Sequence, residues 1–337
     1  MRKLRSLIIA LLLVLAGSAF WYYRSLRPVD ADDSVRRMVE IPQGSTVTRI
    51  GEILEEKGVI RSPLALRLSA RFRGVQERMK AGTFVLRKSQ STAEIIGILA
   101  RGHGEEASVT IPEGFTVRDI DALLAEQGIM EKGELTACAK ACDFSSFAFL
   151  PSGEGQLDRG GKLEGYLFPD TYFIVKDEFV PKLFLERLLG TFRNRVAEGL
   201  ADDLKGSRHS LHEIITMASL VEEETRTEEE RPVVAGILWK RFGEGMMFGV
   251  DAAVRYAVNK PRGDITKDDL ETDSPYNLRK VRGLPPGPIA NPSLSSIKAA
   301  LHPKETAYWY YLHDANGTIH YAVTNDEHNT NRAKYLR

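Results

Sequence analysis

Cysteine is scarce in this chain of 337 residues, which contains only Cys138 and Cys142. Two thiols are too few for a scaffold held by several disulfides or for a zinc ribbon with four cysteine ligands. The two residues are four positions apart on an expected helix, a geometry that disfavours a bridge between them. We therefore interpret both as packing residues, with a disulfide as the alternative if the helix frays.

An excess of positive charge is also missing. Lys and Arg together number 46, as do Asp and Glu, so the net charge is zero. A protein that binds nucleic acid by neutralising phosphates is therefore disfavoured. The 43% apolar content excludes a wholly disordered chain, and the length indicates two or more domains.

Signatures of cofactor and metal chemistry are absent as well. The sequence has no Gly-x-Ser-x-Gly elbow and no Gly-x-x-x-x-Gly-Lys-Ser/Thr phosphate loop. The seven histidines are scattered, and His209-x-x-His212-Glu213 does not have the spacing of a zinc hydrolase. We expect neither a metal nor a nucleotide cofactor.

One long uncharged run stands at the N-terminus. Leu7 to Tyr23 spans 17 residues without a charge and ends in an aromatic cluster typical of a membrane–water interface. As a helix it would be about 26 Å long, close to the thickness of a bilayer core. The basic residues of Met1–Arg5 predict a cytoplasmic tail at 1–5, a single transmembrane helix at 6–23, a linker at 24–38 and an extracytoplasmic remainder. The alternative is a cleaved signal peptide, for which Gly17-Ser18-Ala19 offers small residues.

An internal repeat follows, with an offset of 70 residues between Val39 and Val109. Both copies read as a strand, a Pro-x-Gly turn, and a helix that is capped by Thr46 or Thr116 and closed by a glycine. The pattern predicts a duplicated α/β module at 39–155 that is similar to LysM-type carbohydrate-binding modules. The alternative is a spacer that holds the next domain away from the membrane.

The segment His209–Thr225 is the strongest candidate for catalysis. On a helical wheel, Glu224 and Glu222 point toward the apolar face and Glu223 points to solvent. Desolvation raises the pKa of a carboxyl group, and a general acid at neutral pH needs such a shift. The alternative is an ordinary charged helix end.

Two loops rich in aromatic and amide groups follow in the C-terminal half, and the first contains Tyr276 and Asn277. Aromatic rings stack on the apolar faces of sugars, and amides bind their hydroxyl groups. These loops predict a sugar-binding cleft, although a purely structural role is the alternative.

Taken together, several motifs in one order resemble the YceG-like endolytic murein transglycosylases. The resemblance covers nearly the whole chain. The motifs are Leu163–Tyr172, Ala218–Thr225, Asp251, Ser274–Asn277, Gly283–Pro292 and Lys298–Pro303. The family's catalytic glutamate is the second Glu of a Glu-x-Glu-Thr motif, which is Glu224 here. This sequence departs from the family at Gly249, where a glutamine is common, and that puts a substrate contact there in doubt.

The resemblance implies an α+β fold with a catalytic domain at 156–337 and no cofactor. It implies a lytic transglycosylase in the inner (cytoplasmic) membrane that cleaves the MurNAc-GlcNAc bond within peptidoglycan glycan strands and leaves 1,6-anhydroMurNAc ends. Such cuts would terminate nascent strands, and peptidoglycan synthases are candidate partners. Glu224 would be catalytic, and the expected substrate-binding residues are Glu222, Asp251, Tyr276 and Asn277. Two alternatives stay open: a non-catalytic glycan-binding scaffold of the cell-wall machinery, and a two-carboxylate muramidase that uses Glu222 or Asp251 beside Glu224.

Overall fold

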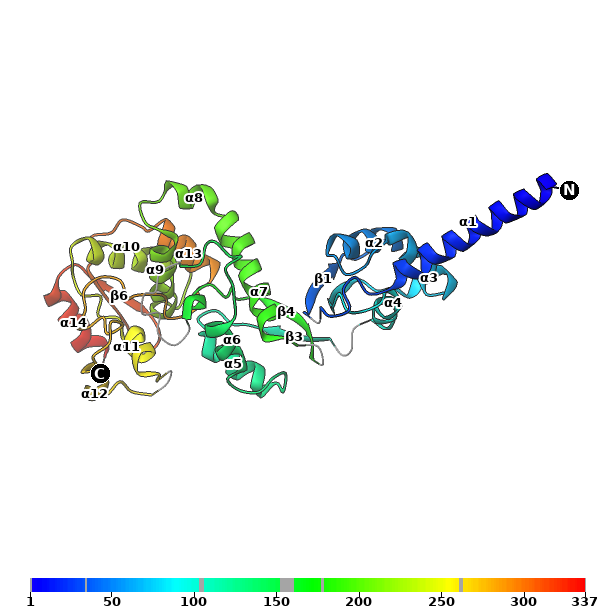
Figure 1. The fold of residues 1–337 in the computed structure, drawn as a ribbon. Coiled ribbons are helices and arrows are strands. Elements are labelled where there is room, and N and C mark those ends of the chain that lie inside the picture. Colours follow the sequence, from blue (N-terminus) through cyan, green and yellow to red (C-terminus); the bar gives the residue numbers. More distant parts are fainter. Residues whose placement is uncertain are drawn as a thin grey trace. The chain divides into compact units, whose positions relative to one another are not determined.

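The computed structural model describes residues 2–33, 35–102, 106–151, 161–176, 179–260 and 263–336. The chain divides into two compact units, which can be followed in Figure 1 by the colours that mark residue number. The first comprises Met1–Ala107 with Phe173–Glu178, and the second comprises Ser108–Tyr172 with Phe179–Arg337. The fold is α+β, as expected, and the described residues form three two-stranded sheets among many helices.

The first unit begins with the 25-residue helix α1 (Arg2–Leu26). Its window Ile9–Leu26 is long and apolar enough to cross a membrane by length and composition, a test that a signal sequence also passes. Only 6% of this window is buried, so the helix is not the core of a soluble domain.

The end of α1 is attached to the module that follows it. The Tyr22 ring meets the Phe72 ring edge-on, with centroids 6.3 Å apart. Thr92 Oγ1 donates to the Ser25 carbonyl, and Arg61 Nη2 donates to the Pro28 carbonyl at 2.8 Å. Part of the expected linker at 24–38 is therefore bound to the module.

The module of the first unit has the order strand, helix, helix, strand, helix. Its elements are β1 (Arg37–Ile41), α2 (Val47–Glu56), α3 (Pro63–Phe72), the 3-10 turn η1 (Gln76–Arg78), β2 (Gly82–Leu86) and α4 (Thr92–Arg101). β1 and β2 are antiparallel, with Val39 opposite Phe84. Their inward side chains join those of the helices in one apolar core that includes Ile50, Leu54 and Leu66.

The second copy of the repeat has the same order but closes later. Its elements are β3 (Glu106–Thr110), α5 (Val117–Glu126), α6 (Glu134–Ala141) and β4 (Thr171–Val175). β3 pairs with β4, as β1 pairs with β2. The closing strand thus comes after an insertion and lies beyond residue 155, and most of this copy belongs to the second compact unit. The expected boundary between domains 39–155 and 156–337 lies within 152–160, outside the described residues.

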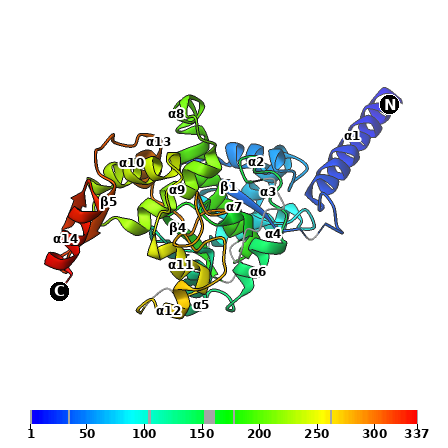
Figure 2. The same cartoon turned by 90° about the vertical axis from the view of Figure 1, so that its left-hand side faces the viewer.

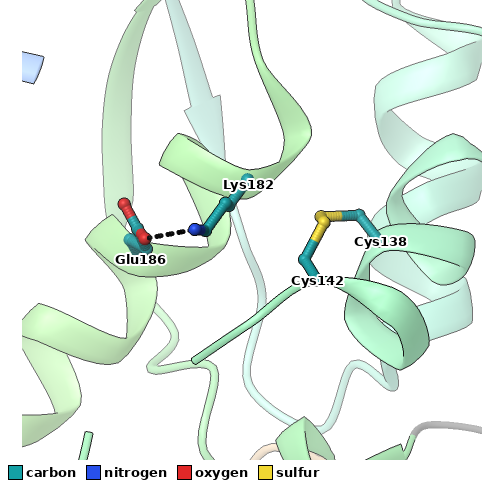
Figure 3. The surroundings of a disulfide bond; sticks show 4 residues. All are labelled: Cys138, Cys142, Lys182 and Glu186. Carbon is teal, nitrogen blue, oxygen red and sulfur yellow. Dashed lines mark ion pairs between the residues drawn. A yellow bond between two sulfur atoms is a disulfide. The ribbon is translucent and has the colours of Figure 1, made fainter. Parts of the chain in front are cut away.

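The two cysteines are joined by a disulfide, which corrects the expectation that they only pack (Figure 3). The expectation assumed that both lie inside one helix. α6 instead ends at Ala141, and Cys142 has an extended backbone with φ −75° and ψ 151°. The Cα atoms of Cys138 and Cys142 are 4.9 Å apart, within the usual range for a disulfide. The nearby pair Lys182–Glu186 belongs to the next helix.

The rest of the second unit is mainly helical, and Figure 2 shows α9 in its midst. The elements are η2 (Gly161–Leu163), α7 (Pro181–Phe192), the π-helix η4 (Arg193–Glu198), α8 (Ala201–Gly206), α9 (Leu211–Glu224), α10 (Glu230–Gly243), α11 (Asp251–Val258), α12 (Lys267–Leu270), α13 (Leu294–Leu301), β5 (Tyr310–His313), β6 (Ile319–Ala322) and α14 (Asn325–Tyr335). β5 and β6 form an antiparallel hairpin, and α14 packs on it.

Asn291 ties the second copy of the repeat into this helical unit. Asn291 Nδ2 donates to the Phe115 carbonyl at 2.7 Å, and its Oδ1 accepts from the Leu167 backbone N–H at 2.9 Å. Glu164 Oε1 accepts from the N–H of Val117, the first residue of α5, at 2.9 Å. Both Asn291 and Glu164 are buried. Because buried polar groups require partners, these hydrogen bonds fix the second copy within the compact unit that also contains α9.

Replacing Gly236 tests the packing of α10. A Cβ at this position would lie 2.0 Å from the Lys304 carbonyl oxygen, whereas one at Gly243 would meet nothing within 4 Å. We expect Gly236→Ala to lower the free energy of unfolding by about 1–3 kcal/mol, the usual cost of overpacking. Gly243→Ala, in the same helix, should leave it unchanged or raise it by up to ~1 kcal/mol. Denaturant unfolding of the two variants checks this, and equal stabilities would contradict the packing.

Candidate active site

Helix α9 carries the three consecutive glutamates, Glu222 to Glu224. Ser210 caps its first turn, accepting from the Glu213 N–H while Glu213 Oε2 accepts from the Ser210 N–H. The eight residues Ile214–Val221 are all buried, because α9 packs against α10, α11 and α13 at once. The helix ends at Glu224, since Thr225 has an extended backbone. A rigid, buried helix thus presents its acidic C-terminal turn to the surrounding elements.

Glu224 has the properties of a general acid. Its Oε2 accepts a hydrogen bond from the Tyr311 hydroxyl at 2.8 Å. Desolvation raises the pKa of Glu224 to about 7; the Tyr311 hydrogen bond opposes this, and the negative charge of Asp251 adds to it. A carboxyl group with this pKa is substantially protonated near neutral pH, so it can donate a proton and later accept one.

Arg241 fixes the two segments that flank Glu224. It lies on α10 and is only 8% exposed. Its Nε and Nη2 both donate to the Trp309 carbonyl, two residues before Tyr311, and its Nη1 donates to the Phe248 carbonyl, three residues before Asp251. The positive charge of Arg241 also lowers the pKa of Glu224, though less than desolvation raises it. One guanidinium therefore links the positions of Tyr311 and Asp251.

Asp251 lies at the first position of α11, and its side chain is 49% exposed. Arg279 reaches its Oδ1 with both Nε and Nη2. The negative charge of Asp251 contributes to the raised pKa of Glu224. An accessible carboxylate beside Glu224 is suited to contact a substrate.

Glu222 has contacts that favour a structural role. Its side chain is 8% exposed, and its Oε1 pairs with Arg231 Nη2 at 3.2 Å. Its Oε2 accepts from the N–H of Ser293 at 2.9 Å and from the Ser293 hydroxyl, and Ser293 is the N-cap of α13. Both oxygens thus hold the fold together rather than pointing to an open surface.

Glu223 is exposed as a residue, in agreement with its place on the helical wheel. Its carboxyl end nevertheless folds back over the second copy of the repeat, because a Cβ on Gly114 would lie 2.9 Å from Glu223 Oε1. Desolvation, followed by the charges of Glu222 and Asp119, raises the pKa of Glu223 to about 7. The turn of the repeat therefore borders the acidic end of α9.

Tyr276 and Asn277, which the sequence suggested as substrate-binding residues, are both buried in this structure. Tyr276 is 2% exposed, and its ring packs on that of Tyr256 with centroids 5.0 Å apart. Asn277 is fully buried, and its Nδ2 donates to the carbonyls of Leu270 and Thr272 at 2.9 Å each. Amide side chains in loops can donate hydrogen bonds to buried backbone carbonyls as well as to ligands. The sequence alone does not distinguish these two roles.

Sequence reasoning missed Tyr311 and Arg241. Arg241 had a signal, since it follows Val234, Ile237 and Leu238 on one helical face, and an arginine in an apolar stripe demands partners. Tyr311 had none, because the pairing of a distant hairpin with the end of α9 is a tertiary contact. Within the described residues, no group of three or more His, Cys, Asp or Glu side chains is arranged to hold a metal ion.

Comparison with known proteins identifies the family. The model of the YceG-like family matches residues 39–334. The endolytic murein transglycosylase of Bacillus subtilis (strain 168) is 34% identical over 96% of this chain and 91% of its own length. That of Streptococcus pneumoniae serotype 2 (strain D39) is 31% identical over 98% of this chain but only 64% of its own length.

A solved structure agrees with this result. The crystal structure of a putative yceG-like protein from Listeria monocytogenes is 28% identical, covers 88% of this chain and 99% of its own, and superposes with a TM-score of 0.62. The resemblance drawn from the sequence motifs is confirmed, and this chain belongs to the YceG-like family.

Proposed function

We propose that this protein is a membrane-anchored lytic transglycosylase that cleaves within peptidoglycan glycan strands, with Glu224 as the catalytic acid and base. The observation that supports it most strongly is a carboxyl group at the end of a buried helix, hydrogen-bonded to Tyr311 and with its pKa raised to about 7. Curated relatives over almost the whole chain bear the name endolytic murein transglycosylase.

The reaction needs one group that gives and then takes a proton. Protonated Glu224 donates to the glycosidic oxygen as the bond from C1 of N-acetylmuramic acid to that oxygen breaks. The Glu224 carboxylate then accepts the proton of the muramyl C6 hydroxyl as that oxygen bonds to C1. The products are a strand with a 1,6-anhydro end and a strand with a free hydroxyl, and Glu224 is protonated again. Tyr311 holds the carboxyl group in place, and Asp251 is the proposed substrate contact.

The alternative of a two-carboxylate muramidase requires a second carboxylate for water or for a covalent intermediate. Glu222 is occupied by Arg231 and Ser293, which argues against it, and Asp251 is paired with Arg279. Mass spectrometry of purified sacculi after digestion separates the possibilities. The proposal predicts 1,6-anhydro ends, a muramidase would give reducing ends that are heavier by one water, and a scaffold would give no products.

The pH profile should report the environment of Glu224. Cleavage should fall as pH rises through about 7, because the acid form is lost there. The Tyr311 hydroxyl stabilises the carboxylate, so Tyr311→Phe should raise the pKa and move this limb to higher pH by roughly one unit, the effect of one hydrogen bond to a charged group. Tyr308→Phe removes a hydroxyl from a ring stacked on Tyr321 and should leave the limb in place. If the activity of Tyr311→Phe fell at the same pH as that of the parent protein, or at a lower pH, the role of this hydrogen bond would be contradicted.

We propose further that α1 is retained as the membrane anchor, with the bulk of the chain on the extracytoplasmic side. The bulky residues Trp21-Tyr22-Tyr23, which directly follow the small residues of the candidate cleavage site, support this. N-terminal sequencing of the mature protein tests it, and a chain that starts near Ala19 or Phe20 would mean a secreted enzyme.

A LysM-like role in glycan binding remains a proposal for the repeat, as does partnership with peptidoglycan synthases. Because the second copy belongs to the compact unit that also contains α9, only the module of the first unit is a candidate for a separate binding module.

A further inference from the structure

Helix α3 leaves one apolar stripe outside the core of the first unit. Leu64, Leu68 and Phe72 are spaced by four residues and therefore share a face. Phe72 is 78% exposed and Leu64 44% exposed. The opposite face, which includes Leu66 and Ala70, is buried against the module. The helix is thus apolar on two sides, and only one of them is used by the fold.

Positive charge surrounds this stripe. Residues 57–80 contain seven lysines and arginines and one acid, Glu77. Those on and just after α3 are exposed: Arg67, Arg71, Arg73, Arg78 and Lys80. By contrast, α2 in the same module carries Glu52, Glu55 and Glu56 on its exposed positions. Exposed arginines also occur elsewhere in the module, such as Arg49 on α2, but beside the exposed apolar residues the basic side chains clearly outnumber the acidic ones.

The contact with α1 places this face at a defined depth. Tyr22 lies in the aromatic cluster at the end of the long apolar run, where aromatic side chains prefer the membrane–water interface. Phe72 meets the Tyr22 ring directly, and α3 runs beside the C-terminal end of α1 in Figure 1. If α1 spans a bilayer, Phe72 is held at the level of the lipid headgroups.

We propose that α3 is a membrane-binding helix that lies on an anionic phospholipid surface. Phe72 and Leu64 enter the interface, and Arg67 and Arg71 extend their charged ends to the headgroup phosphates. The proposal rests on the anchor put forward above and assigns the module of the first unit a role in fixing the protein against the bilayer. Charge complementarity and continuity with α1 favour lipid over a glycan or a second copy of the chain as the occupant.

Fluorescent labels on the full-length protein in lipid vesicles test this. Phe72→Cys, Val14→Cys and Glu56→Cys each provide one reactive thiol, because the native cysteines are bridged and labelling is done without reductant. An environment-sensitive NBD label at position 72 should shift to the blue in vesicles containing phosphatidylglycerol and be quenched by nitroxide lipids. The label at 56, on α2, should stay in water, and the label at 14 reports insertion of α1.

The outcomes separate the two proposals. A label at 14 in lipid with a label at 72 in water overturns the role of α3 but leaves the anchor intact. Both labels in water would overturn the anchor as well. A label at 72 that is shielded yet not quenched by lipid nitroxides would mean that protein covers α3, which also overturns the proposal. Murein cleavage is measured on the same samples, so loss of activity cannot be mistaken for loss of lipid contact.

Charge reversal provides an independent measurement. Arg71→Glu should reduce quenching of the label at 72 by at least half in vesicles with phosphatidylglycerol, and have less effect in pure phosphatidylcholine. Arg36, which lies before β1, is also exposed, so Arg36→Glu is the matched control and should have little effect. Equal responses of the two variants, or no dependence on anionic lipid, would overturn the electrostatic part of the proposal.

Discussion

Glu224→Gln should abolish cleavage of murein, with a loss of at least about 10³-fold, since a positioned acid and base commonly contributes ~10²–10⁴-fold to a rate. The amide has nearly the shape of the carboxyl group and still accepts the hydrogen bond from Tyr311, but it cannot give up and recover a proton. The loss should therefore appear in kcat, without a comparable change in binding to sacculi. Quantification of anhydro ends by mass spectrometry is the measurement.

Glu223→Gln is the matched control for this experiment. It makes the same change one residue earlier, at another carboxyl group whose pKa is raised to about 7. We expect activity close to that of the parent protein, because Glu223 is exposed and its carboxyl end lies over Gly114. A folded Glu224→Gln protein with full activity, or a Glu223→Gln protein that is inactive, would move the catalytic assignment away from Glu224.

Arg241→Lys should cost more than tenfold in activity, although the charge is kept. A lysine ammonium is a point donor and cannot reach both the Trp309 and Phe248 carbonyls with the fixed geometry of a guanidinium. At least one buried carbonyl would lose its partner, which should lower the free energy of unfolding by about 1–3 kcal/mol. Displacement of Tyr311 and Asp251 would then weaken catalysis.

The matched control for Arg241 is Arg282→Lys. Arg282 is exposed and makes one hydrogen bond to the Gly245 carbonyl at 3.1 Å, so its replacement should change neither stability nor activity. The pH profile separates positioning from simple destabilisation. Arg241→Lys keeps the positive charge, but displacement of Tyr311 would remove a hydrogen bond that lowers the pKa of Glu224, so the alkaline limb of the variant should move to higher pH. An unshifted limb in a destabilised variant would reduce Arg241 to a structural residue.

Local patterns predicted the elements that carry the site. The caps at Thr46 and Thr116 accept the expected backbone hydrogen bonds, and the helix with Glu224 lies where its periodicity placed it. Pro232 falls in the first turn of α10, as its missing N–H requires. These features depend on residues that are close in sequence, so the spacing of residue types is sufficient to predict them.

Other features of the structure depend on information that local spacing does not contain. The closing strand β4 of the second repeat follows an insertion, so its pairing with β3 could not be read from the offset between the two copies. Tyr276 and Asn277 have residue types suited to sugars, but burial against Tyr256 and the Leu270 and Thr272 carbonyls decides their role. The disulfide depended on where one short helix stops.

The hydrogen bond between Asn291 and Phe115 also determines the order in which the protein can fold. These residues are 176 positions apart, whereas β1 and β2 of the first unit are joined through a short stretch of chain. Contacts of long sequence separation form slowly, and domains generally fold as units from the N-terminus during synthesis. The module next to α1 can complete its core while the rest of the chain is still emerging. The core around α9 cannot form until Asn291 has been synthesised. The hydrogen bond between Glu224 and Tyr311 forms only after nearly the entire chain has emerged, so a partially synthesised chain has no complete active site.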